Sequence, residues 1–175
     1  ILRQRAAFKR YFREDAPFYS MFDVGTYTFA PYKVVWPWIA EGMKTAVVSL
    51  KDQKVITPEH NTSFVDTKDL RDAYYICALL NSSPADIAIR SFYSGGGGGI
   101  GSPRMLENIR IPKFDSQNHL HQKLSQLSEK THELARRGAK SEIKLIEQEI
   151  DQAAAELWNI TAVELKEIKK SMAEL

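Results

Sequence analysis

The sequence lacks the features that mark several specialised classes of protein. Its single cysteine, Cys77, has no partner for an internal disulfide, and its apolar helical surroundings are typical of a buried thiol. Charged residues interrupt every apolar run before the roughly 18 residues that a membrane span needs. We therefore expect a cytoplasmic protein in a reducing compartment, with no disulfide scaffold and no membrane partner.

The start of the sequence lacks the pattern of a signal peptide. The sequence begins at Ile1, and no charged-then-apolar leader follows, so no signal peptide is expected. The 175 residues are 43% hydrophobic and 26% charged, a composition typical of a folded domain. The missing initiator methionine indicates a piece of a longer protein.

Motifs for nucleotide binding are absent or out of context. The glycine run formally contains Gly-x-Gly-x-x-Gly at Gly96, Gly98 and Gly101. A dinucleotide site needs this pattern between a strand and a helix, whereas here it follows a predicted helix and leads into Ser102 and Pro103. We reject dinucleotide binding and expect a loop at residues 94–103.

Catalytic and metal-binding patterns are also missing. No Gly-x-Ser-x-Gly elbow or cysteine–histidine signature supports nucleophilic catalysis. His119 and His121 are two residues apart on a predicted helix, so they face different directions, and no cysteine or carboxylate set completes a metal site. We expect a non-catalytic chain without a metal or other cofactor of its own.

The net charge of +2 hides an asymmetry along the chain. It arises from 24 basic and 22 acidic residues, and residues 1–58 alone hold nine basic and five acidic side chains. Five basic residues precede the first acid: Arg3, Arg5, Lys9, Arg10 and Arg13. Such a cluster suits a phosphate backbone or an acidic partner, although a solvated helix face has the same composition.

Aromatic and β-branched runs separated by turn formers predict a small sheet. The expected strands are 33–36, 45–50 and 54–56, with a final strand at 109–112, and a short basic helix is expected within 2–13. Apolar spacing predicts a helix over 68–81, and Ser83 followed by Pro84 predicts the N-cap of a second helix.

The last sixty residues have a different pattern. Two apolar stripes at heptad spacing run over 120–134 and 143–157, and Gly138 interrupts them. The short break predicts an antiparallel, coiled-coil-like hairpin, and Thr161 with Glu164 predicts a capping box for a third helix. The expected fold is α+β: a small twisted mixed or barrel-like sheet with two packed helices over 1–115, then the helical hairpin with a short terminal helix over 116–175.

Basic and aromatic residues in or beside turns of this sheet are the candidate binding residues. Arginine and lysine contact phosphates or guanine, tryptophan stacks on bases, and glycine lets a partner approach the backbone. The candidate DNA-binding set is Lys33, Trp36, Lys44, Lys54, His60, Arg90, Ser94, Gly97 and Arg104, with Trp38 beside it.

Five segments together resemble a known family. They are VGTYTFAPYKVVW at 24–36, ITPEH at 56–60, AYYICALLNS at 73–82, IRIPKF at 109–114 and ELWNIT at 156–161. In this order they are similar to the C-terminal target-recognition domain of N6-adenine DNA methyltransferases, including TaqI-like specificity domains and restriction-modification enzymes. The junction of strand and helix also resembles type I specificity subunits.

The resemblance implies a module that recognises a site in double-stranded DNA for an upstream methyltransferase domain. That domain would use S-adenosylmethionine and hold a flipped adenine with an Asn/Asp-Pro-Pro-Tyr/Phe motif. Phe29-Ala30-Pro31-Tyr32 shares only the trailing Pro-Tyr with this motif, so this chain is not expected to methylate DNA.

Two alternatives remain open from the sequence. The chain is also consistent with a fragment of a type I-like specificity subunit. The rival interpretation is a protein-interaction module in which the heptad helices form a dimer through the hairpin and the sheet binds a peptide or a partner domain.

Overall fold

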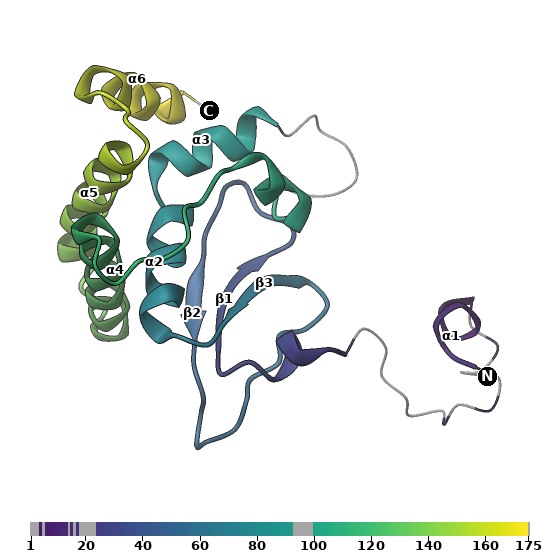
Figure 1. Ribbon diagram of the computed structural model, residues 1–175. Coiled ribbons are helices and arrows are strands. Elements are labelled where there is room, and N and C mark those ends of the chain that lie inside the picture. The colour runs from purple at the N-terminus through teal and green to yellow at the C-terminus, as the bar shows by residue number, and fades with distance from the viewer. Residues whose placement is uncertain are drawn as a thin grey trace.

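Helix α2 (Leu70–Leu80) lies between the sheet and the C-terminal helices in the computed structural model (Figure 1). The structure describes residues 4, 6–13, 15, 17, 24–92 and 100–174. The predicted short basic helix is present as α1 (Ala6–Tyr11), and a 3₁₀ helix, η2 (Thr26–Phe29), precedes the sheet. In the described part of the chain, no helix is long and apolar enough to cross a membrane.

The sheet has three antiparallel strands, with β1 (Tyr32–Pro37) between β2 (Ala46–Val48) and β3 (Thr62–Thr67). Val34 of β1 and Trp36 are buried on the face that packs against α2. On the other face, the ring of Phe64 lies 5.9 Å from the ring of Tyr27 in η2. The predicted α+β class is confirmed, and its sheet is antiparallel and open, neither mixed nor barrel-like.

Two of the four predicted strands are wrong. Residues 54–56 do not form a strand, since Lys54 makes only an isolated bridge with Lys51, and the third strand is instead β3. Residues 109–112 follow a 3₁₀ helix, η3 (Pro103–Asn108), without regular structure. The carbonyl of Pro112 accepts a hydrogen bond from the Tyr75 hydroxyl at 3.0 Å, so this segment is tied to α2 rather than to the sheet.

The helices after α2 follow the predicted order. Helix α3 (Ser83–Ser91) begins one residue earlier than expected, because Ser82 is its N-cap. Helices α4 (His119–Arg137) and α5 (Lys140–Leu157) form the predicted antiparallel hairpin (Figure 1). Gly138 joins them with φ of 71°, the left-handed conformation that glycine adopts at a helix end.

The apolar stripes of the hairpin are buried within this chain. Leu124, Leu134, Ile146 and Ile150 form one core cluster together with Leu79 of α2. All strands of the described residues lie before the boundary expected at residue 115, but a shared core crosses it.

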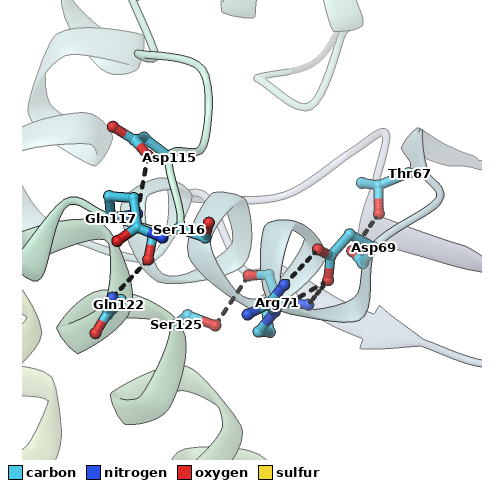
Figure 2. Close-up of polar contacts among 8 residues, drawn as sticks. All are labelled: Thr67, Asp69, Arg71, Asp115, Ser116, Gln117, Gln122 and Ser125. Atoms are coloured by element: carbon cyan, nitrogen blue, oxygen red, sulfur yellow. Dashed lines mark hydrogen bonds and ion pairs between the residues drawn. The ribbon is translucent and has the colours of Figure 1, made fainter.

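A polar stripe on α4 faces α2. His121, Ser125, Ser128 and His132 recur at steps of four, three and four residues, and the first three are buried. Small serine side chains let the two helices approach closely, and the Ser125 hydroxyl donates to the carbonyl of Arg71 at 2.9 Å (Figure 2). This contact fixes the first turn of α2 on α4.

The start of α2 is capped locally. The carboxylate of Asp69 accepts a hydrogen bond from the backbone N–H of Arg71 at 2.9 Å and pairs with its guanidinium at 3.1 Å (Figure 2). Hydrogen bonds from Arg71 lower the pKa of Asp69. The cap thus favours a charged carboxylate at the positive end of the helix.

The last helix, α6 (Ala162–Ala173), has the predicted capping box of Thr161 and Glu164. Asp151 of α5 is buried and joins three helices. It accepts hydrogen bonds from the backbone N–H of Ser83 at 2.6 Å and from its hydroxyl at 2.9 Å, and it pairs with Lys169 of α6 at 2.8 Å. One carboxylate thereby links α5, the N-terminus of α3 and α6.

We predict that Cys77 is unreactive in the folded protein. Its side chain is fully buried in α2, and burial raises the pKa of the thiol. A thiol reagent such as Ellman's reagent, added at pH 8, should modify Cys77 more than roughly a hundredfold faster in urea-unfolded than in native protein. Rapid modification of native protein would contradict the buried placement.

We predict that His132 stabilises the contact between the hairpin and the sheet. Its Nε2 accepts a hydrogen bond from the backbone N–H of Val47 at 2.9 Å, so the proton lies on Nδ1 and is donated to the carbonyl of Ser128 at 2.7 Å. His132→Ala should lower the free energy of unfolding by about 1–3 kcal/mol, measured by urea denaturation. The control is His119→Ala, an exposed residue on the same helix, and equal effects of both substitutions would contradict this role.

Candidate nucleic-acid interface

Three segments far apart in the sequence meet at the end of β1. The backbone N–H of Trp38 donates to the carbonyl of Asn61 at 2.9 Å, and the carbonyl of Trp38 accepts from the N–H of Gly101 at 3.0 Å. The loop after β1, the segment before β3 and the exit of the glycine-rich segment are therefore joined by backbone hydrogen bonds.

Gly101 is the residue on which this junction depends. Its carbonyl accepts hydrogen bonds from Nε1 of Trp36 at 2.8 Å and from the hydroxyl of Ser63 at 2.9 Å. A Cβ atom at this position would collide with the carbonyl oxygen of Pro37 and lie 2.7 Å from that of Trp38. Glycine is required here for close approach of two backbones.

The residues before the glycine-rich segment are fixed to the same loop. Arg90 pairs with Asp86 at 3.0 Å, and the other carboxylate oxygen of Asp86 accepts from the N–H of Met43 at 2.8 Å. Gly42 packs against the guanidinium of Arg90. Residues 90 and 101 are thus both anchored to the β1–β2 loop.

We call the surface formed by these segments the loop face, defined as residues 38–42, 59–61, 90 and 100–104. Two hollows open on it, of about 580 Å³ and about 770 Å³, and Trp38 and His60 line both. The larger hollow continues along η2 and the outer side of β3, where Tyr27 and Phe64 line it. Aromatic rings therefore form much of the wall of these hollows.

Apolar and charged side chains are mixed on the loop face. Ile39 is 84% exposed and Trp38 is 40% exposed, while Arg104 is exposed in η3. Acidic groups also occur there: Glu59 lies 3.4 Å from His60, and Glu41 is exposed in the β1–β2 loop. The loop face can accept a flat apolar or aromatic group next to isolated cations.

Two of the predicted DNA-binding residues are buried. Lys33 is 1% exposed, its ammonium donates to the carbonyl of Ala30 at 2.8 Å, and burial lowers its pKa while Asp66 acts in the opposite direction. Trp36 is 2% exposed and is held by Gly101. As placed here, both side chains support the sheet and neither reaches the surface.

The other predicted residues fall into separate groups. His60, Arg90 and Arg104 lie on the loop face, whereas Lys44 lines a third hollow, of about 530 Å³, between β2 and the hairpin. Lys54 is exposed in the turn that follows β2. The predicted positions Ser94 and Gly97 lie outside the described residues. The DNA-binding set as a whole stays a prediction.

The sequence analysis did not single out Ile39 or Gly101 as site residues. Ile39 could have been noticed as an apolar residue next to Trp38 in a loop bounded by Pro37 and Gly42. Gly101 gave no such signal, because its role depends on a backbone that comes from 64 residues earlier in the chain.

The Pro-Tyr sequence at Pro31 and Tyr32 leads into β1, where Tyr32 pairs with Thr67 of β3. It is therefore part of the sheet and does not form a pocket for a base. Among the described residues, no group of three histidine, cysteine, aspartate or glutamate side chains is arranged to hold a metal ion.

Comparison of the chain with protein-family models, with curated proteins and with solved structures finds no match.

We predict that Gly101→Ala disrupts the loop face. The added Cβ must displace the backbone of Pro37 and Trp38, which should lower the free energy of unfolding by roughly 2–4 kcal/mol. Gly138→Ala is the comparison: nothing lies within 4 Å of its Cβ position, and its positive φ predicts a loss of only about 1 kcal/mol. Urea denaturation measures both, and a smaller loss for Gly101→Ala would contradict the close approach.

Proposed function

We propose that this chain is a target-recognition module for double-stranded DNA, which positions its site for an adenine-N6 methyltransferase domain elsewhere in the parent protein. That domain would bind S-adenosylmethionine and transfer the methyl group, with or without an associated endonuclease. This chain contributes recognition and no catalysis. The proposal combines the resemblance of five segments with the arrangement of the loop face.

The observation that carries the proposal is the anchoring of the glycine-rich segment. Residues 90 and 101 on either side of it are fixed to the β1–β2 loop, through Asp86 and through the backbone of Trp38. His60 and Arg104 lie on the same face. The loop face thus brings together residues that are far apart in the sequence, such as His60 and Arg104, which are about 45 positions apart.

Different basic residues of the chain would make the different contacts that DNA binding requires. The exposed guanidinium of Arg104 can reach a phosphate or the acceptor edge of a guanine. Further phosphate contacts would come from the basic N-terminal segment, where Lys9 and Arg13 are exposed. Lys33 and Trp36 have no direct part in this proposal because they are buried.

A second candidate function is binding of a peptide by the larger hollow. Its wall combines the rings of Tyr27, Trp38 and Phe64 with the carboxylates of Glu59 and Asp66. Aromatic rings beside carboxylates attract a cationic side chain with an apolar stem. The hairpin gives this alternative no further support, because its heptad stripes are buried within the chain.

We predict that Arg104→Ala weakens binding to DNA. Fluorescence anisotropy with mixed-sequence duplexes at 50–200 mM salt should show a loss in affinity of roughly tenfold, with a smaller salt dependence if Arg104 contacts a phosphate. Two controls should leave affinity unchanged: Lys144→Ala on α5, which is exposed away from the loop face, and Lys33→Met, whose ammonium is buried.

Three results would count against the proposal: no DNA binding at 50 mM salt, binding with no dependence on salt, or equal losses for Arg104→Ala and Lys144→Ala. Binding of a lysine-rich peptide that Trp38→Ala abolishes, without DNA binding, would favour the second candidate.

A further inference from the structure

We propose that Trp38 and Ile39 form an apolar wedge that enters a step between stacked base pairs of the bound DNA. The inference rests on the proposed function and adds how the loop face would engage the duplex. It concerns the tip of the β1–β2 loop, where Trp38 lies beside the candidate set predicted from the sequence and Ile39 is new.

Ile39 stands out among the described apolar side chains. At 84% exposed it is the most exposed large hydrophobic residue of the described chain, whereas its neighbour Ala40 packs against the core. The loop is therefore held to the protein at Ala40, and the Ile39 side chain has little packing role in the fold.

The backbone next to this side chain is held by hydrogen bonds and close packing. Trp38 is held by hydrogen bonds on both its N–H and its carbonyl, and Gly101 packs directly on Pro37. Ile39 is β-branched, which restricts its side chain to few rotamers. A wedge needs this stiffness, since a flexible side chain would fold away from the stack rather than separate two bases.

The surroundings of Ile39 favour bases over phosphates. Pro37, Trp38, Ile39, His60 and Asn61 line a hollow of about 580 Å³ beside the tip. The tryptophan and histidine rings offer flat surfaces on which an unstacked base can stack.

The charges near the tip lead to the same preference. Glu41 is exposed two residues after Ile39, and Glu59 is exposed next to His60, which lines the hollow beside the tip. Both carboxylates repel phosphates, so the apolar tip is expected to meet the base stack. Arg104 is exposed in η3 directly after Pro103, which lines the larger hollow, and is the cation that would contact the phosphate backbone. Apolar wedges inserted between base steps kink DNA and widen the surface that it shares with the protein.

Two of the other strongly exposed apolar residues lie on the C-terminal helices. Val163 is 72% exposed on α6 and Leu145 is 62% exposed on α5, both on the helical side of the molecule. Neither is among the residues that line the three hollows described above. They therefore serve as matched controls for loss of an exposed apolar side chain.

The experiment has two stages. A bound duplex is first selected from a pool with 20 random base pairs, using the 175-residue chain. 2-Aminopurine is then placed at successive positions of that duplex, because its fluorescence rises when it leaves the stack. The wild-type chain should raise the fluorescence at one step, and Ile39→Ala should abolish that rise and weaken affinity roughly tenfold with unchanged salt dependence.

Ile39→Val, which keeps the β-branched carbon, should retain the fluorescence rise, and Val163→Ala should behave as wild type. Selection of no duplex would overturn both the proposed function and the wedge. A selected duplex without a fluorescence rise at any position, or with a rise that survives Ile39→Ala, would overturn the wedge alone and leave DNA recognition standing.

Discussion

The burial of α2 on both of its sides is the constraint on which the rest of the structure depends. Ala73, Cys77 and Leu80 pack toward the sheet, while Tyr75 and Leu79 pack toward the hairpin. An 11-residue helix can meet two layers only if its neighbours approach closely, and the alanines of α2 and the serines of α4 permit this. The hairpin thereby becomes part of the same core as the sheet, although its sequence pattern is that of an independent coiled coil.

This layering also decides which surfaces remain for binding. The helices cover one face of the sheet, and their polar contacts, such as those of Asp151 and His132, use side chains that hold elements together. The loop end of the sheet is different, because backbone hydrogen bonds of Trp38 and Gly101 join its segments and the side chains that support them, such as Trp36 and Ser63, are buried. Side chains at that end, above all Ile39 and Arg104, are left free to face a partner.

Periodicity in the sequence predicted the helices well and the strands poorly. Both heptad stripes, the break at Gly138 and the capping box at Thr161 are local features, so they were visible without any tertiary information. Strand β3 was missed because Thr62–Thr67 has only two apolar residues and so shows little strand pattern. Its pairing with β1 stabilises it as a strand. At 109–112 a strand was predicted where none exists. The alternating apolar residues of this segment contact the core around α2 and do not pair with a neighbouring strand.

The candidate site also depends partly on local sequence and partly on tertiary packing. The sequence by itself determined the residue types available, among them a run of glycines between Arg90 and Arg104. Only the tertiary structure decided which of them reach the surface: Lys33 and Trp36 are buried, whereas Ile39 is exposed. The reason is that exposure depends on which segments pack over a residue. The close approach of Gly101 to Pro37 and Trp38 is made by residues that are neighbours in space and distant in the chain.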